Sequence, residues 1–350
     1  MTLASKEDWE ETRERLQAWW RGEFFGRCAM AVCAPKKNPP NAPRPAPKTT
    51  PQPNADPWSK MYYGGEALPW WMGTCSAVSC IPSVLGCPRV TDTPNGLWRP
   101  MLNDPARIGA EDLRLDTNSP GYRAAMDVVE HGAREVRGKA FVAIGTLLGV
   151  GDTLAALRGT ERLLTDCVER PEQVYAAEKH LNAIWMDYYE RRHDVIKDVN
   201  AGGSINWLGV WSPGKYYSVQ CDLSYNVGAG MFRELFLPFV REQTEFLDHS
   251  LYHLDGVNAF RHIDALLELP KLGAIQFFPG TNRPSALHYM DLLQKIQAAG
   301  KRLYLHLTPD EVEPALGNLS ARLLYIQTMT NTEDEARTLL RNAGKWSVDR

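Results

Sequence analysis

The sequence has no long apolar run, no basic stripe and no large excess of one charge. No stretch approaches the roughly 18 to 20 apolar residues that a membrane-spanning helix needs. The formal net charge of -3 over 350 residues gives no reason to expect a nucleic acid partner. The N-terminal stretch MTLASKEDWEETRERLQAWW is acidic and amphipathic, which does not fit a signal peptide. We therefore predict an intracellular, cytoplasmic protein that binds neither a membrane nor nucleic acid.

Paired cysteine motifs are also lacking. The seven cysteines are an odd number and include no CxxC pair, so we expect free thiols in a reducing cytoplasm. Three of them, Cys75, Cys80 and Cys87, lie close together in the sequence, and a metal site there is the alternative. No histidine lies near them in the sequence, which weakens that alternative.

A dinucleotide-binding turn is a further absence, since no GxGxxG follows the first buried stretch, residues 28–35. From residue 121 onward, short apolar runs alternate instead with amphipathic stretches. Strands and helices that alternate over short connections are typical of parallel βα units. About eight strands over this length predict a single α/β domain, residues 1–350, folded as a (β/α)8 barrel, the TIM barrel. An open doubly wound sheet is the alternative.

Proline is concentrated in one segment near the N-terminus. PKKNPPNAPRPAPKTTPQPNADP has no apolar periodicity, so it is not expected to fold on its own. It directly follows the first predicted strand, at the end of a barrel where active-site loops emerge. We therefore predict that residues 36–70 form a loop excursion across the barrel mouth rather than a second domain.

The predicted strands end in polar and aromatic side chains. In a (β/α)8 barrel the catalytic residues lie at the carboxyl ends of the strands, so these positions are candidate site residues. Histidines, carboxylates, amides and tryptophans gather there, which favours an enzyme with a small-molecule substrate. The strand-end residues are Asp152, Trp207, Trp211, Asp222, His253, Asp255, Gln276, His306, Thr308, Gln327 and Thr328.

Several of these residues have an equally simple structural interpretation. Asp152 and Asp222 can cap the helices that follow them, as aspartates at strand-to-helix turns often do. His253 can be a core histidine bonded to a backbone carbonyl. These polar strand ends are too numerous for capping alone, so an enzyme remains the favoured interpretation.

Tryptophan is abundant, with eleven residues, and several lie in loop-like contexts. Tryptophans between glycines and prolines line clefts that bind flat or sugar-like ligands, or they fill the core beneath loops. We predict that Trp71, Trp207 and Trp211 contact substrate together with Gln276 and His306.

The stretch LYHLDG places His253 and Asp255 two residues apart at a strand end. Alternate side chains of a strand point to the same side, so both can face the centre of the barrel. An imidazole and a carboxylate so placed can act as an acid-base pair, and we predict His253, Asp255 and Asp222 as catalytic residues. A zinc site with His306 as third ligand is the alternative.

From about residue 140 to the end, the chain resembles the uroporphyrinogen decarboxylase superfamily. The matching stretches are GTLLGVGDTLAALRGTERLLTDCVERPEQV, VQCDLSYNVGAGMFRELFLPFVREQ, YHLDG, AIQFFPG and IQAAGKRLYLHLTPDEVEPAL. The second is the most specific. This superfamily contains the decarboxylase itself and barrel methyltransferases that work with methyl-corrinoid proteins, so the resemblance also implies a barrel.

The chain matches the motifs of some branches of the superfamily better than those of others. The decarboxylases carry an arginine-rich N-terminal motif that clamps porphyrinogen carboxylates, whereas this chain offers only Arg21 and Arg27 there. The thiol-directed methyltransferases hold zinc with a His-x-Cys pair and a distal cysteine. His253 matches that histidine, Asp255 replaces the first thiolate, and IQTMTNT has no cysteine at the distal position.

The resemblance therefore implies a methyltransferase that demethylates a small methylated or methoxylated substrate, with methyl-corrinoid on a separate partner protein. Activation of a thiol is not expected, because a carboxylate makes a harder metal site than thiolates do. The alternatives are a hydrolase or lyase acting on a carbohydrate or glycoside, a decarboxylase of a non-porphyrin acid, and a non-catalytic ligand-binding barrel. The sequence does not specify the substrate, the metal content or the oligomeric state.

Overall fold

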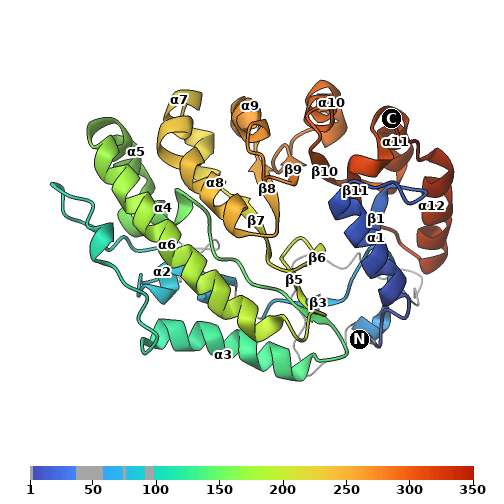
Figure 1. The fold of residues 1–350 in the computed structure, drawn as a ribbon, viewed down its shortest axis with the longest axis horizontal. Coiled ribbons are helices and arrows are strands. Elements are labelled where there is room, and N and C mark those ends of the chain that lie inside the picture. Colours follow the sequence, from blue (N-terminus) through green and yellow to red (C-terminus); the bar gives the residue numbers. More distant parts are fainter. Residues whose placement is uncertain (1–2, 37–57, 74–75, 91–97) are drawn as a thin grey trace.

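The computed structural model describes residues 3–36, 58–73, 76–90 and 98–350. Its centre is a seven-stranded sheet with the strand order β2-β1-β11-β10-β9-β8-β7. The strands form an arc, and helices cover its outer side (Figure 1). The strands of this sheet are β1 (Ala29–Pro35), β2 (Met61–Gly65), β7 (Tyr216–Gln220), β8 (His249–Asp255), β9 (Ala274–Phe278), β10 (Arg302–His306) and β11 (Leu324–Met329).

Neighbouring strands in this sheet are parallel, except that β2 runs antiparallel to β1. The β1–β2 pairing places Ala31 opposite Gly65. The predicted excursion of residues 36–70 therefore contains a strand that returns along β1. Residues 37–57, which hold most of its prolines, lie outside the described residues, so its course across the mouth stays a prediction.

Two further sheets have two strands each. β3 (Trp70–Trp71) pairs with β4 (Phe141–Val142), and β5 (Gly203–Ile205) pairs with β6 (Trp211–Pro213). Within the described ranges the ladders form three separate sheets, so the structure shows a mixed α/β fold, and the predicted closed barrel is not confirmed. These strands of two or three residues are too short to form a continuous ladder around the molecule.

The stretch SINWLGVW is a hairpin and not the single strand that its apolar character suggests. The Gly209 amide donates to the Asn206 carbonyl, and Gly209 has a φ of 73°. The left-handed backbone at Gly209 is one that glycine adopts without penalty, so the chain reverses there. As a consequence Trp207 lies in the turn and Trp211 lies on the returning strand.

Most helices follow the strands as the sequence pattern predicts. Pro171 breaks the helical stretch at the expected place, since one helix ends at Glu169 and the next begins at Pro171, a favourable first helical position. The α-helices are α1 (Trp9–Arg21), α2 (Ile81–Val84), α3 (Pro120–Glu135), α4 (Asp152–Arg158), α5 (Thr160–Glu169), α6 (Pro171–Ile196), α7 (Ala229–Met231), α8 (Leu237–Phe246), α9 (Ile263–Leu267), α10 (Met290–Ala298), α11 (Val312–Asn318) and α12 (Glu333–Trp346).

Shorter helical segments connect several of these elements. The 3₁₀ helices are η1 (Trp58–Lys60), η2 (Ser76–Ser79), η3 (Ala110–Asp112), η4 (Asp222–Asn226), η6 (Val257–His262), η7 (Ala286–Tyr289), η8 (Pro309–Glu311) and η9 (Ala321–Leu323), and η5 (Phe232–Phe236) is a π-helix. In the part of the chain described here, no helix is both long enough and apolar enough to cross a bilayer.

Helix α1 packs against the amino ends of the strands. Its buried residues include Trp9, Leu16, Trp19 and Trp20, which recur at helical spacing. Trp20 contacts the rings of Tyr216 and His249, the first residues of β7 and β8, at 5.1 and 4.9 Å. This buried aromatic face closes one end of the strands. Because α1 covers the amino ends, a site accessible to ligands is expected at the carboxyl ends of β7 to β11.

Candidate active site

A row of polar side chains crosses the carboxyl ends of four neighbouring strands. The strand register pairs Gln220 of β7 with His253 of β8, His253 with Gln276 of β9, and Gln276 with Tyr304 of β10. Residues in register across a sheet point to the same face, so the four side chains lie side by side. Asp222, Asp255 and His306 each lie two positions later in the sequence than Gln220, His253 and Tyr304. They form a second layer beyond the first row.

His253 is held in a defined orientation. Its Nδ1 lies 2.6 Å from Gln276 Oε1, an acceptor, so Nδ1 carries the proton and Nε2 is the proton-accepting nitrogen of the neutral ring. Nε2 lies 3.8 Å from Asp255 Oδ2, and Trp207 contacts the imidazole edge-on at 4.9 Å. Burial lowers the pKa of His253, and the bond to Gln276 and the charge of Asp255 offset this only in part. The ring is therefore neutral near pH 7.

Asp152 and Asp222 form a carboxyl pair that Gln220 bridges. The Gln220 Nε2 group donates to Asp152 Oδ2 at 3.2 Å and to Asp222 Oδ2 at 3.1 Å. Burial, and then the charge of Asp222, raise the pKa of Asp152 to about 7. Two carboxyl groups so close together disfavour double ionisation, so the pair retains a proton near neutral pH.

Asp222 is the more exposed member of this pair. It is exposed at the mouth of a cavity, yet enclosing protein atoms and the neighbouring Asp255 charge raise its pKa to about 7. Asp222 is thus suited to donate a proton.

Two cavities meet at Asp222 and Asn226. The first, of about 440 Å³, also contains Asp255 and Tyr225, and we call it the Asp222 cavity. The second, of about 490 Å³, also contains Asp152 and Trp98. Each volume is within the range of small-molecule sites, so the carboxyl groups border space for a ligand.

Asp152 has a role that the sequence does not reveal. Capping of the following helix was one expectation, but Asp152 begins α4, and the cap residue Gly151 has no side chain. Instead Asp152 Oδ1 accepts the Leu223 amide at 2.8 Å and ties two strand-end loops together. Behind it, burial raises the pKa of Glu178 to about 8. Sequence position makes Asp152 a candidate, and the contact between these loops shows how it is held in the site.

The predicted substrate-binding residues separate into two groups. Trp207 and Gln276 contact His253, and His306 lies at the exposed end of β10, 5.1 Å from the Tyr304 ring. The histidines are close enough that burial and His253 both lower the pKa of His306, to about 4. His306 is exposed, so its imidazole is accessible from the site.

Trp211 and Trp71 do not lie with the other candidates. Trp211 is 1% exposed, contacts Trp9 of α1 at 5.2 Å, and donates its indole N–H to the Asn200 carbonyl. The hairpin turn at Gly209 is the reason, because it directs β6 back toward α1. Trp71 packs so closely on Gly132 of α3 that a Cβ there would overlap its ring. Both tryptophans belong to the core, so their prediction as pocket residues is wrong.

The predicted zinc ligands do not converge. Over the described residues, no group of three histidine, cysteine, aspartate or glutamate side chains is arranged to hold a metal ion. Thr328, near the position at which the resemblance would place a thiolate, is buried. His253, Asp255 and His306 therefore do not fit a closed zinc site. Cys75 lies outside the described residues.

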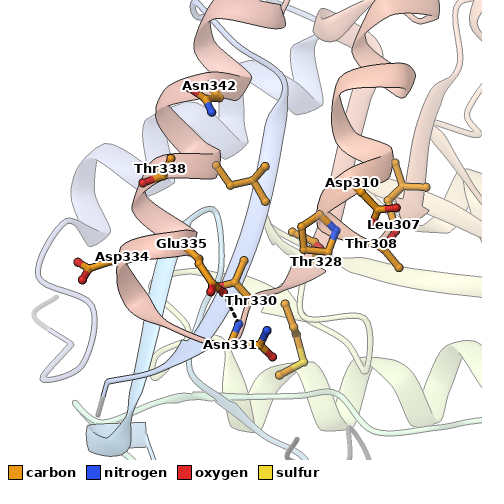
Figure 2. Close-up of a pocket in the computed structure, with 13 residues that line it drawn as sticks. Leu307, Thr308, Asp310, Thr328, Thr330, Asn331, Asp334, Glu335, Thr338 and Asn342 are labelled. Carbon is orange, nitrogen blue, oxygen red and sulfur yellow. Dashed lines mark hydrogen bonds between the residues drawn. The ribbon is translucent and has the colours of Figure 1, made fainter. Parts of the chain in front are cut away.

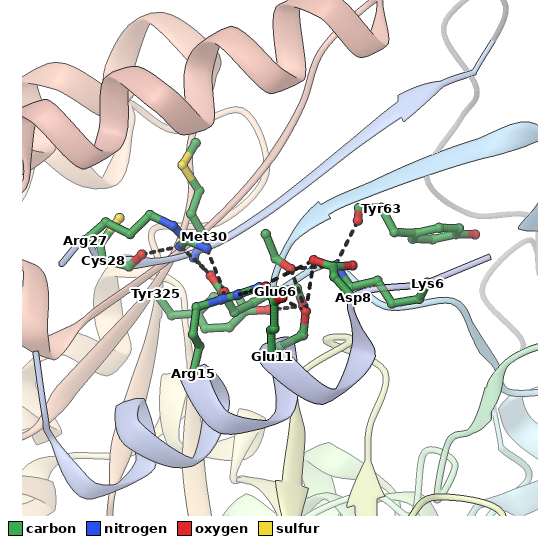
Figure 3. Close-up of polar contacts among 12 residues, drawn as sticks. Lys6, Asp8, Glu11, Arg15, Arg27, Cys28, Met30, Tyr63, Glu66 and Tyr325 are labelled. Carbon is green, nitrogen blue, oxygen red and sulfur yellow. Dashed lines mark hydrogen bonds and ion pairs between the residues drawn. The ribbon is translucent and has the colours of Figure 1, made fainter. Parts of the chain in front are cut away.

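The arginines near the N-terminus have structural partners. Arg27 donates to both oxygens of Glu66, at 2.6 and 2.8 Å, and Arg15 donates to Glu66 as well at 2.7 Å (Figure 3). Arg21 pairs with Glu23 at the surface. Burial alone would raise the pKa of Glu66, but Arg27 and Arg15 hold it down at about 2. This network joins α1 to β1 and β2, and it engages Arg27 in a structural contact.

The comparisons with known proteins identify a fold. No family model matches the sequence, and no curated protein matches it. Among solved structures, a methyltransferase from Methanosarcina mazei superposes with a TM-score of 0.58, covering 95% of this chain and 98% of that chain at 11% identity. At this identity the likeness shows the fold alone. The chain therefore shares its fold with a methyltransferase over nearly its whole length.

Proposed function

We propose that this protein is an enzyme that removes a methyl group from a small methylated or methoxylated substrate. One observation carries the proposal: a proton-accepting His253 and a proton-donating Asp222 lie on one rim of this fold. The shared fold with a methyltransferase supports the reaction class. The resemblance to the superfamily implies a separate corrinoid protein as partner, and its cofactor would supply the nucleophile that receives the methyl group.

The side chains of this protein would handle the proton and the substrate. When the bond between the methyl carbon and the substrate oxygen breaks, the electron pair stays on oxygen. Asp222 donates its proton to that oxygen and becomes a carboxylate. The demethylated substrate therefore departs as a neutral group and not as a poor anionic leaving group. His253 Nε2 accepts a hydrogen bond from the substrate, while Gln276 holds the ring and Trp207 provides an apolar wall.

The reaction class is testable with free cobalamin as methyl acceptor. The protein is incubated with reduced cobalamin and a panel of methoxylated aromatic compounds and methylated amines. Formation of methylcobalamin, followed by absorbance and mass spectrometry, identifies an active substrate. We expect transfer from at least one class and a loss of about tenfold or more in His253→Ala, the scale of one lost hydrogen bond to the substrate. Transfer at the same rate in that variant would contradict the assigned role.

The glycoside hydrolase or lyase alternative has one specific observation in its favour. Asp222 and Asp255 line the same cavity of about 440 Å³. A carboxyl pair of which one member holds a proton is the arrangement used for glycosidic bond cleavage. A panel of aryl glycosides separates the two proposals. Release of the aryl group without any methyl transfer would favour the hydrolase.

A further inference from the structure

One cavity, of about 780 Å³, contains none of the proposed catalytic residues. We call it the β10–β11 cavity, because it lies beside the carboxyl ends of these strands. In Figure 2, α12 forms one wall with Glu335, Thr338 and Asn342, and the segment with Leu307 and Asp310 forms the facing wall. The volume is typical of small-molecule sites and exceeds what ordered water alone requires.

Charge in this cavity has one sign. Of the described residues that line it, three are acidic (Asp310, Asp334 and Glu335), and none is lysine, arginine or histidine. In the described ranges none of these three acids forms an ion pair. Arg337 lies near Asp334 but is paired with Glu333 at 2.6 Å. The cavity is therefore electronegative.

Helix capping alone explains part of this acidity. Glu335 Oε2 accepts the Asn331 amide at 2.9 Å, and the Glu335 amide donates to Thr332 Oγ1. These bonds satisfy the first turn of α12, and its acidic residues offset the positive end of the helix dipole. An anion would therefore gain little binding free energy at this helix terminus. Capping does not account for the cavity or for its buried hydroxyl.

Thr328 provides the independent sign of a ligand. The residue lines the cavity and is 4% exposed, and its Oγ1 makes no hydrogen bond within the described part of the chain. On β11 the alternation of side chains directs Ile326 and Thr328 outward, whereas Gln327 bonds Tyr304 on the inner face. An unpaired buried hydroxyl is costly, so a hydrogen-bonding ligand at this position would be stabilising.

The lining also restricts the kind of cation. Leu307, Met329 and Leu339 give the cavity apolar surface. Among the described residues no three acidic, histidine or cysteine side chains are arranged so that they could hold a metal ion, which argues against a bare metal ion. We propose that the β10–β11 cavity binds a small organic ammonium compound whose N–H groups donate to Thr328. Asp310 and Glu335 balance its charge, and the apolar residues contact its carbon chain.

The proposal is tested by calorimetric titration of the full chain at low salt with three probes of similar size. Putrescine carries charge and N–H donors, tetramethylammonium carries charge alone, and 1,4-butanediol carries neither charge nor ammonium. We expect saturable binding of putrescine, weaker binding of tetramethylammonium, and no saturable binding of the diol. No saturable binding of putrescine, or equal binding of the diol, overturns the proposal.

Variants separate the two parts of the site. The double variant Asp310→Asn with Glu335→Gln keeps a capping side chain at position 335. It should lower the affinity for putrescine and for tetramethylammonium by at least about tenfold. Thr328→Val should lower only the affinity for putrescine, by about fivefold, whereas the Thr328→Ser variant should bind putrescine as the parent does. Asp291→Asn, an exposed acid on α10, is the matched control and should change nothing. Equal putrescine affinity in the double variant, or in Thr328→Val, contradicts the assignment.

Discussion

Gln276 Oε1 accepts a hydrogen bond from His253 Nδ1 at 2.6 Å, between the adjacent strands β9 and β8. This bond places the proton of the neutral imidazole on Nδ1 and leaves Nε2 as the acceptor. The strand register brings the two residues together, so the backbone positions the histidine before any substrate binds. Catalysis in the proposed reaction depends on this preorganised ring.

Gln276→Leu should reduce turnover by about tenfold or more, because the ring loses the acceptor that orients it. Gln276→Glu keeps the acceptor but adds a negative charge, which favours the protonated imidazole and raises the pKa of His253. The activity that requires neutral His253 should then begin at a higher pH. A pH-rate profile checks this prediction, and an unmoved acid limb in the Glu variant would count against it.

Activity should fall as pH rises through about 7, because Asp222 must be protonated and its pKa is raised to about 7. Asp255 is one cause of that rise, so Asp255→Asn should move the alkaline limb of the profile to lower pH. Asp222→Asn should remove proton donation altogether. An alkaline limb that stays in place in the Asp255→Asn variant would show that Asp255 does not influence Asp222.

The two tryptophans of the hairpin should behave differently. Trp211 is buried against α1, so Trp211→Ala should reduce the free energy of unfolding by about 3 to 5 kcal/mol. Trp207 contacts His253 at the site, so Trp207→Ala should mainly raise KM or lower kcat. Urea unfolding and steady-state kinetics on both variants check the division. Equal loss of stability in both would contradict it.

The Glu66 network should make stability depend on pH in the acid range. The pKa of Glu66 is about 2 in the folded protein against an ordinary 4.5, so its contribution is complete above about pH 4.5. The contribution is lost as pH falls toward 2. Glu66→Gln should reduce stability at pH 7 by about 3 to 5 kcal/mol, because two buried arginine contacts lose their charge partner.

The matched control for that prediction is Glu23→Gln. Glu23 pairs with Arg21 at the surface, where ion pairs contribute little, so its loss should leave the unfolding curve unchanged. Thermal unfolding of both variants between pH 2 and 7 makes the comparison. A Glu66→Gln protein with the same acid dependence as the parent would show that another group controls it.

The sequence predicts the part of the fold in which each strand is long and regular. Alternation along LYHLDG and AIQFFPG indicates that His253 and Gln276 end neighbouring strands, and their register then makes the bond. The closed barrel was expected because two-residue and three-residue strands cannot be distinguished from longer ones in an apolar stretch. WLGVW illustrates this, since only the backbone of Gly209 reveals that Trp211 turns back toward α1.

Contacts between distant loops determine how two of the strand-end candidates, Asp152 and Thr328, are placed, and the sequence does not predict those contacts. Asp152 joins the site through the Leu223 amide, 71 residues away along the chain, and through Gln220. A pattern of side chains along one segment contains no information on such a partner. Thr328 presents the same difficulty, because its position at a strand end does not show that its hydroxyl faces the helices.

The rate of a single turnover in His253→Ala tests the central claim most directly. With the methyl donor identified by the cobalamin screen, the parent and the variant are compared under conditions in which methyl transfer limits the rate. The account predicts that the variant transfers the methyl group at least about tenfold more slowly, as expected for the loss of a substrate hydrogen bond, with an unchanged Tm. A variant that turns over at the parental rate would contradict it.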